Sequence, residues 1–401
     1  LGDVYKRQPQ ENKKKERVKK MIKFGKWVVK FRIPILILSF LLLIPTGIIY
    51  MNTRINYDIL SYLPGDIETM KGQDILLDEF GTGAFSVAVI DGMQEKEISQ
   101  LEDKLKEIDH VKDVLWYGAL ADISIPMDML PDDLKDSLQN ADTGSQLMII
   151  TFDTSMSADE TLDAIEEIRG LTNEQCLLSG MSAVVTDIKK ICNSEVIMYV
   201  VIAAGLSALV LALTMDSFLL PFIFLLSIGM AIVYNLGTNF IAGEISFVTQ
   251  ALAAVLQLAV TMDYSIFLWH SYLENQERYP DDRKRAMSHA ISQTLTSVVG
   301  SSITTIAGFL AMCFMTFTLG MDLGVVMAKG VVFGVIGCVT ILPSMILAMD
   351  KWIEKTRHKA IIPDLGRIGG FVTKHYWIFI ILFLAVSYTH LRAHETLANL
   401  V

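Results

Sequence analysis

Charged side chains are scarce in this sequence of 401 residues. Asp, Glu, Lys and Arg make up 19% of the chain, whereas hydrophobic residues make up 52%. The mean hydropathy of +0.43 lies outside the range expected of a water-soluble globular chain. The composition therefore excludes an ordinary soluble protein and indicates an integral membrane protein.

Cysteine is also rare, and the four residues Cys176, Cys192, Cys313 and Cys338 lack metal-ligand spacing. We therefore expect no metal site and no cofactor. A disulfide between Cys176 and Cys192 stays open as an alternative to two free thiols.

Motifs for familiar catalysis are missing from the sequence. There is no Walker loop, no GxSxG elbow, no HExxH pair and no paired CxxC. We therefore expect a secondary active transporter rather than an enzyme, driven by an ion gradient that supplies ~2.3 kcal/mol per charge per 100 mV. No nucleic-acid partner is expected.

Long hydrophobic runs are the dominant feature. Six of them can each cross a hydrocarbon core of ~30 Å, which takes about 20 helical residues. These predicted spans cover residues 33–51, 195–215, 217–240, 245–270, 297–317 and 323–349. A seventh run, residues 376–386, is too short to cross and is interpreted as a helix that has been cut.

Both ends of the sequence resemble translated sequencing-adapter sequence. The chain opens with LGDVYKRQ, and the apolar run that reaches Val386 changes abruptly into SYTHLRAHET. We therefore predict that residues 1–8 and 387–401 are non-native. On this interpretation the C-terminal half of the same protein is missing.

The distribution of charge predicts an orientation. Lys and Arg gather in residues 9–32, 271–296 and 350–375, which the positive-inside rule assigns to the cytoplasm together with the N-terminus. Residues 52–194 hold 28 Asp and Glu against 10 Lys and Arg, and we expect them to form an extracytoplasmic domain. Within 271–296, an amphipathic helix is predicted to lie along the membrane surface.

Hydrophobic periodicity within residues 52–194 predicts two β-α-β units. The expected strands are 85–90, 111–116, 146–152 and 175–178, and the helices are 96–108 and 158–168, the second capped by Ser157. Together they give the ferredoxin-like order β-α-β-β-α-β. Residues 119–143 are interpreted as an insertion, and residues 181–194 as a helical continuation into the second span.

Asp263 is the most informative residue. It lies in the apolar run Ala251 to Trp269, whose only other ionisable group is Tyr264. A carboxylate at the bilayer centre costs ~2.5–3.5 kcal/mol on insertion scales, so partners must come from another helix or from water. A carboxyl group that alternates between wet and dry surroundings can bind and release a proton. We predict a proton relay of Asp263 and Tyr264, with plain packing as the alternative for Tyr264.

Two further sets of residues are possible relay partners. Ser301, Ser302, Thr304 and Thr305 lie in a small-residue run of the fifth span, where close packing alone is the competing explanation. Lys329 is the only basic residue inside the sixth span. We expect it either to extend to the outer interface or to form an ion pair in the relay.

Three segments together resemble the RND superfamily, in its branch of MMPL-like predicted exporters. They are Val260-Thr-Met-Asp-Tyr-Ser-Ile-Phe-Leu268, Ser302-Ile-Thr-Thr-Ile-Ala-Gly-Phe309 and Ile341-Leu-Pro-Ser344. The likeness covers residues 21–386. It implies an α-helical membrane protein with an α+β porter-type domain, arranged as an RND half-transporter of 1+5 transmembrane helices and part of a seventh.

The resemblance also implies a function. The whole protein would have twelve spans, with a second Asp-Tyr pair facing Asp263 and Tyr264, and would export lipids or other hydrophobic or amphiphilic molecules across the cytoplasmic membrane. The implied partners are membrane lipids, the substrate and the missing C-terminal half, and a homo-oligomer stays open. The alternatives are an accessory subunit of protein export and a lipid-sensing receptor that does not transport.

Overall fold

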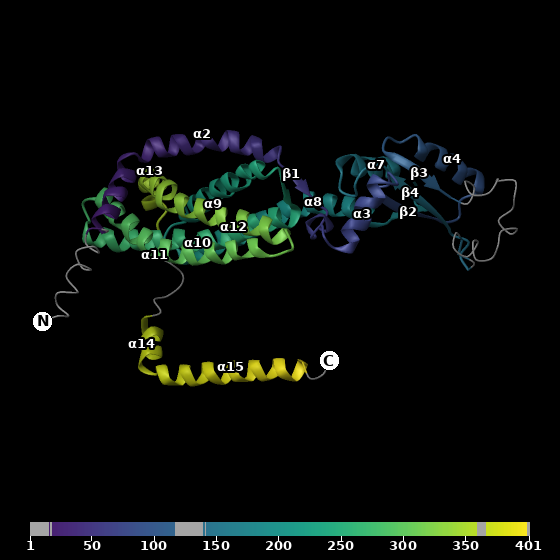
Figure 1. The fold of residues 1–401 in the computed structure, drawn as a ribbon. Helices are drawn as coiled ribbons and strands as arrows, with labels where there is room; N and C mark the ends of the chain where they lie inside the picture. Colours follow the sequence, from purple (N-terminus) through teal and green to yellow (C-terminus); the bar gives the residue numbers. More distant parts are fainter. Residues whose placement is uncertain (1–15, 17, 117–138, 141, 359–365, 399–401) are drawn as a thin grey trace.

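The computed structural model describes residues 16, 18–116, 139–140, 142–358 and 366–398. Figure 1 shows a bundle of long helices at one end of the molecule and an α/β domain at the other. Helix α8 connects the two, while the C-terminal helices α14 and α15 extend away from the bundle. We call the α/β part the outer domain.

Six helices in the described part of the chain are long and apolar enough to cross a membrane, or seven if the bent pair at residues 368–389 counts as one span. The helical elements are α2 (Arg32–Met51), α8 (Met181–Thr214), α9 (Leu220–Gly237), α10 (Phe247–Arg278), α11 (Arg283–Ala311), α12 (Leu319–Ile336), the π-helical η5 (Gly337–Ile341), α13 (Leu342–Lys355), α14 (Gly366–Lys374) and α15 (Tyr376–Ala398). Short 3-10 helices lie at Thr238–Ala242 (η3) and Met312–Phe314 (η4).

Helix ends in the bundle are set by side-chain caps and by proline. Ser246 Oγ accepts a hydrogen bond from the Val248 N–H at the start of α10, and the Asp282 carboxylate accepts one from the Arg285 N–H at the start of α11. Pro343 has no N–H to donate, and the chain forms the π-helical turn η5 immediately before it. α12, η5 and α13 thus form one interrupted helix.

The prediction of a loop over residues 271–296, with a helix lying along the membrane surface, is wrong. Helix α10 continues to Arg278 and α11 already begins at Arg283, so four residues connect them. The amphipathic segment is the first part of α11, where Ala286, Met287 and Ala290 are fully buried in the bundle core. Their apolar face packs against neighbouring helices instead of lying along a membrane surface.

The helical path at the C-terminal end also differs from expectation. α15 runs without a break from Tyr376 to Ala398, past Val386, where the predicted seventh span stopped. It forms a bend of 81° with α14.

The outer domain is an antiparallel four-stranded sheet with two helices packed on one face. Its elements are β2 (Ala84–Ile90), α4 (Glu95–Lys106), β3 (Val111–Leu115), β4 (Gln146–Phe152), α7 (Asp159–Leu171) and β5 (Cys176–Ser179), with α3 (Glu68–Asp78) preceding them. The sheet order is β3-β4-β2-β5. Alternate residues of β2 and β4, such as Ala88 and Ile150, are buried together with Ile98 of α4 and Ile165 of α7.

The structure decides two smaller expectations about this domain, and a third falls mainly on residues that it does not describe. The residue that caps α7 is Ala158, without a side-chain hydrogen bond, so the predicted cap at Ser157 is wrong. Cys176 and Cys192 are both free thiols, which excludes the disulfide alternative. The predicted insertion 119–143 lies mainly outside the described residues.

The second face of the sheet has no helix packed on it among the residues that the structure describes. Alternation along the strands places Phe85, Leu115, Ile149 and Leu177 on this face, and all four are exposed, Leu177 to 66%. We call it the open sheet face. Its apolar character distinguishes it from the usual solvated face of an antiparallel sheet.

Helices α2 and α9 pack closely because of a glycine. A Cβ atom added to Gly237 would lie 2.4 Å from the carbonyl oxygen of Thr46 on α2. The Tyr234 hydroxyl also donates a hydrogen bond of 2.5 Å to the Ser39 carbonyl. The first span therefore contacts the bundle through α9.

This contact leads to a stability prediction. Gly237→Ala should destabilise the bundle by about 1–3 kcal/mol, because α2 must move away from α9. The matched control is Gly229→Ala on the same helix, where an added Cβ meets nothing within 4 Å. Thermal unfolding in detergent should show a lower midpoint for Gly237→Ala only, and equal midpoints would contradict the proposed close approach.

Candidate functional site

Asp263 lies on the face of α10 that the described chain leaves uncovered. Its side chain is exposed and makes no hydrogen bond or ion pair with any described residue. Leu252, Leu256 and Phe267, which are also exposed, lie on the same helical stripe at spacings of four and seven residues. The carboxylate thus interrupts an otherwise apolar surface.

Tyr264 points in another direction, because adjacent residues of a helix differ by about 100° around the axis. It is 7% exposed, and its hydroxyl accepts a hydrogen bond of 3.1 Å from Ser302 Oγ of α11. Its backbone carbonyl accepts a hydrogen bond of 3.3 Å from Cys338 Sγ in η5. Tyr264 therefore connects α10 with two neighbouring helical segments.

The other hydroxyls predicted as relay partners bond within their own helix. Ser301 Oγ donates to the Val298 carbonyl, and Thr304 and Thr305 both donate to the Ser301 carbonyl. The structure thus brings Ser302 to Tyr264, whereas no hydrogen bond joins Ser301, Thr304 or Thr305 to Asp263 in the part of the chain described. Their role in a relay stays a prediction.

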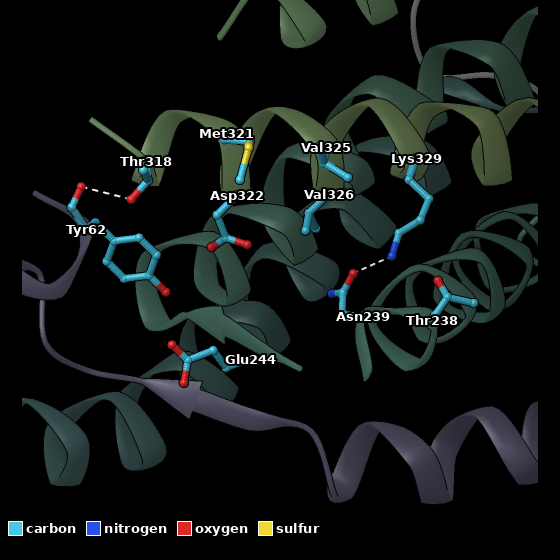
Figure 2. Close-up of a pocket in the computed structure, with 10 residues that line it drawn as sticks. All are labelled: Tyr62, Thr238, Asn239, Glu244, Thr318, Met321, Asp322, Val325, Val326 and Lys329. Atoms are coloured by element: carbon cyan, nitrogen blue, oxygen red, sulfur yellow. Dashed lines mark hydrogen bonds between the residues drawn. The ribbon is translucent and has the colours of Figure 1, made fainter. Parts of the chain in front are cut away.

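Lys329 lies in a pocket near the outer domain, which we call the outer pocket (Figure 2). Its ammonium group donates a hydrogen bond to Asn239 Oδ1 and forms no ion pair with Asp263 among the described contacts. The pocket has a volume of about 470 Å³. Its lining comprises Tyr62, Thr238, Asn239, Glu244, Thr318, Met321, Asp322, Val325, Val326 and Lys329.

Asp322 holds the start of α10 at the edge of this pocket. Its Oδ2 accepts hydrogen bonds from the Ser246 N–H at 2.9 Å and from the Thr249 hydroxyl at 2.7 Å. A carboxylate is favoured there by the positive end of the helix dipole. Burial, followed by the charges of Asp322 and Glu244, raises the pKa of Tyr62, so its phenol stays protonated at neutral pH.

A buried amide pair lies between α9 and α10. Asn235 Nδ2 donates a hydrogen bond of 3.0 Å to Gln257 Oε1, and both side chains are almost fully buried. Gly330 of α12 makes room for this pair, because a Cβ there would lie 2.7 Å from Asn235 Nδ2 and 3.0 Å from Gln257 Oε1. One helical turn further on, a Cβ on Gly334 would lie 2.6 Å from Thr261 Oγ1. This pair was not predicted from the sequence, although amides inside apolar spans were the available signal.

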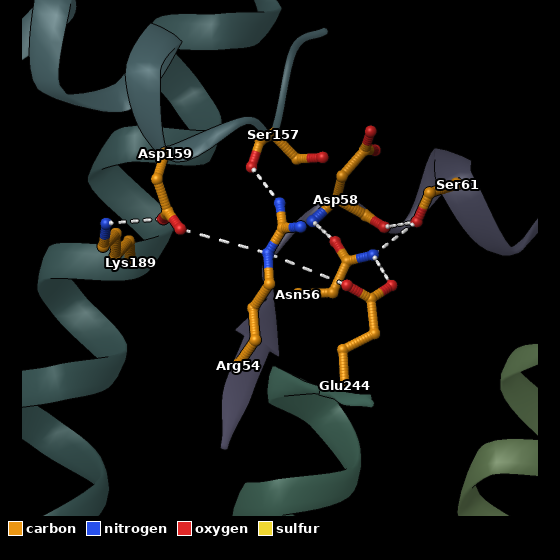
Figure 3. Close-up of polar contacts among 8 residues, drawn as sticks. All are labelled: Arg54, Asn56, Asp58, Ser61, Ser157, Asp159, Lys189 and Glu244. Atoms are coloured by element: carbon orange, nitrogen blue, oxygen red, sulfur yellow. Dashed lines mark hydrogen bonds and ion pairs between the residues drawn. The ribbon is translucent and has the colours of Figure 1, made fainter. Parts of the chain in front are cut away.

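A polar network connects the bundle with the outer domain (Figure 3). Strand β1 (Arg54–Asn56), which follows α2, pairs in parallel with β6 (Glu244–Ser246), which precedes α10. Arg54 forms ion pairs with Glu244 at 3.8 Å and with Asp159 of α7 at 4.0 Å. Lys189 of α8 contacts the same Asp159 at 3.5 Å. We call these contacts the junction.

The junction charges are largely exposed, so each ion pair contributes only about 0–1 kcal/mol. Their effect is to fix the positions of four chain segments relative to one another. As for metal binding, the described residues contain no group of three or more His, Cys, Asp or Glu side chains suited to hold an ion.

The amide pair gives a second prediction. Gln257→Leu should destabilise the protein by about 1–2 kcal/mol, because Asn235 is left without its buried partner. The double variant Asn235→Leu/Gln257→Leu should recover part of that loss, since neither position then leaves a buried amide without its partner. Unfolding midpoints of the two single variants and the double variant test this, and strictly additive losses would show that the two amides do not interact.

Curated relatives cover much of the chain. Probable transport protein MmpL12 of Mycobacterium tuberculosis is 24% identical over 299 residues, which are 71% of this chain and 24% of that protein. Putative membrane protein SCO5905 of Streptomyces coelicolor is 25% identical over 57% of this chain and 28% of its own length. Putative membrane protein MJ1562 of Methanocaldococcus jannaschii is 34% identical over 29% of this chain and 27% of its own length. This chain thus spans about a quarter of the length of these relatives.

Among solved structures, the crystal structure of SecDF, a translocon-associated membrane protein from Thermus thermophilus, matches with a TM-score of 0.45 and 15% identity. The match covers 80% of this chain and 38% of that one. SecDF in its super-membrane-facing form matches with a TM-score of 0.43 and 13% identity. This match covers 82% of this chain and 39% of that one.

The model of the MMPL family matches residues 88–377, which confirms the predicted resemblance to RND-type, MMPL-like proteins. The apolar helices agree with this match, as do relatives described as membrane proteins. The chain is a multi-pass membrane protein and belongs to the MMPL family.

Proposed function

We propose that this chain is the N-terminal half of a proton-driven exporter that moves lipids or other hydrophobic or amphiphilic molecules across the cytoplasmic membrane. The family and a relative described as a probable transport protein support transport. The observation that carries proton coupling is Asp263, a carboxylate without a described partner on an apolar helix face.

The proposed topology places the N-terminus in the cytoplasm and residues 52–194 outside it. One span, α2, precedes the outer domain, and five spans follow it. The outer domain is then a ferredoxin-like porter domain, which its sheet order supports. The basic clusters at the end of the bundle opposite the outer domain support the orientation.

The exposed stripe of α10 explains why a second half is required. If Asp263 faced lipid, its charge would cost ~2.5–3.5 kcal/mol even on the lenient insertion scale. Coverage by a facing helix with its own polar group would remove most of that cost. We propose that the C-terminal half supplies this helix, with a second Asp-Tyr pair opposite Asp263 and Tyr264.

Protonation of Asp263 would change the contact between the two halves. Two ionised carboxylates that face each other repel, whereas a protonated one can donate a hydrogen bond. Each proton bound would therefore favour one arrangement of α10 against its partner helix, and each proton released would favour the other. The gradient then drives a cycle of two conformations.

Helix α10 also provides the route to the outer domain. Its first turn is held by Asp322 and follows β6, whose Glu244 contacts Arg54 of the junction. Arg54 in turn contacts Asp159 of the outer domain. A displacement of α10 would thus be transmitted to the outer domain through β6 and β1, while the continuous helix α8 provides a second connection.

The central test compares Asp263→Asn with Glu274→Gln in the full-length gene product at matched expression. Both variants remove one carboxylate from α10, but Glu274 lies at the end of the helix in an exposed pair with Arg278. Substrate-stimulated proton flux in inverted vesicles should fall at least tenfold for Asp263→Asn and stay within twofold of wild type for Glu274→Gln.

The outcomes separate the candidate functions. Undiminished flux and export in Asp263→Asn would overturn the relay. Absence of substrate-stimulated flux and export in the wild type as well would favour a lipid-sensing receptor. Loss of flux with unchanged lipid export, accompanied by slower secretion of proteins, would instead support an accessory of protein export.

A second variant tests the part played by Tyr264. Tyr264→Phe keeps the ring in the bundle core and removes only the hydroxyl that accepts from Ser302. We expect a partial fall in proton flux, about threefold to tenfold. The unfolding midpoint should fall only by the amount that one lost hydrogen bond causes, about 0.5–1.5 kcal/mol. A midpoint that falls in proportion to the flux would assign Tyr264 to packing alone.

A further inference from the structure

A basic cleft lies at the end of the bundle opposite the outer domain. It has a volume of about 560 Å³ and opens between the N-terminal helical segment, residues 18–30, and the start of α11. Its charged lining consists of Lys26, Lys30, Arg32, Lys284 and Arg285 against a single acid, Asp282. Neither the proposed relay nor the junction uses any of these residues.

The positive charge of the cleft is not compensated within the described chain. Among the described residues, no ion pair involves any of the five basic side chains. Arg32 donates to the Val29 carbonyl, and Arg285 lies over the Tyr279 ring. The Asp282 carboxylate already accepts from the Arg285 N–H as the cap of α11.

The neighbouring Arg283 shows what a compensated charge looks like in this region. Its guanidinium group bonds to both Asp350 and Glu354 of α13. The cations of the cleft have no such partners, so an anion entering it would meet five positive charges and no competing internal salt bridge. Together they favour a ligand with concentrated negative charge.

The cleft is built by close helix packing rather than by chance proximity of long side chains. A Cβ added to Gly25 would lie 2.3 Å from the Ser288 carbonyl oxygen, so only glycine lets the N-terminal segment approach α11 this closely. Val28 and Val29 are buried on the same side and anchor the segment. Lys26 and Lys30 are thereby held near Lys284.

The surroundings of the cleft indicate a membrane interface. Trp27 and Phe31, on the same segment, are exposed, as expected of aromatic side chains at the level of lipid head groups. Immediately after Arg32, the exposed residues Ile33, Ile37 and Leu41 form an apolar stripe along α2. A ligand held in the cleft can therefore place hydrocarbon chains against this stripe.

We infer that the cleft binds the phosphate head group of an anionic phospholipid from the cytoplasmic leaflet. Basic pockets between helices on this side of a membrane suit such head groups, because phosphate charge and apolar chains are recognised together. The apolar stripe favours a lipid over a free phosphate ion. This site is independent of Asp263 and of the proposed transport cycle.

The test titrates phosphatidylglycerol into the purified full-length protein in a neutral detergent, with native mass spectrometry as the readout. The cleft variant is Lys26→Gln/Lys30→Gln/Lys284→Gln. The matched control, Lys19→Gln/Lys20→Gln/Lys23→Gln, removes the same charge from exposed positions of the same segment outside the cleft. We expect affinity to fall at least tenfold in the cleft variant and less than twofold in the control.

Further binding measurements identify the ligand and test whether the shape of the cleft matters. Phosphatidylcholine should bind at least tenfold more weakly than phosphatidylglycerol, and inorganic phosphate at 10-fold excess should not displace the lipid. Gly25→Leu keeps every charge but should weaken binding about as much as the cleft variant. Unfolding midpoints verify that each variant is folded.

Three results would overturn the inference. Unchanged phosphatidylglycerol binding in the cleft variant would show that the cleft is not the site. Equal losses in the cleft variant and its control would show diffuse attraction to the basic segment. Displacement by inorganic phosphate would show a site for a free anion instead of a lipid.

Discussion

Within a hydrocarbon layer, a polar group must find its partner inside the protein, and this constraint governs the bundle. The backbone meets it by forming long helices. Several buried side chains meet it in pairs, such as Asn235 with Gln257 and Tyr264 with Ser302. On α10, the Thr261 hydroxyl is buried without a partner among the described residues, and the Asp263 carboxylate departs from the rule at an exposed position.

The position of Asp263 on α10 accounts for this departure. α10 packs against α9, α11 and α12, so three of its sides are satisfied within this chain. The fourth side holds Asp263 and the exposed apolar stripe. One helix thus combines a packed interior with a surface suited to a facing helix, and its first turn is attached to the junction. In the proposed mechanism, proton binding at Asp263 and movement at the outer end would share one rigid helix.

Much of the architecture was predictable from the sequence for simple physical reasons. Apolar runs of about 20 residues have few uses other than crossing a membrane, and β4 was predicted at residues 146–152 because alternate side chains face the core. Helical periodicity alone does not tell which surface an apolar face meets. Ala286 and Met287 were therefore assigned to a membrane surface, whereas they pack in the bundle.

The candidate site was less predictable, because its contacts join distant parts of the chain. Adjacent residues of a helix point in different directions, so Asp263 is exposed while Tyr264 is buried. Ser302 was predicted as a possible relay partner because it lies in a run of small residues in the fifth span. Only the fold shows that its hydroxyl bonds to Tyr264. The outer pocket is lined by Tyr62, Asn239 and Asp322, which lie in separate segments of the chain. No local sequence pattern therefore predicts it.

The open sheet face has a practical consequence for biochemical work on the outer domain. Phe85, Ile149 and Leu177 form an exposed apolar surface on a sheet whose outer strands, β3 and β5, have unpaired edges within the described residues. Such surfaces and edges promote association between copies of a soluble fragment. A fragment cut out at residues 52 and 194 would carry them into water and is expected to self-associate, so polar substitutions on this face are the natural first step toward a monomeric sample.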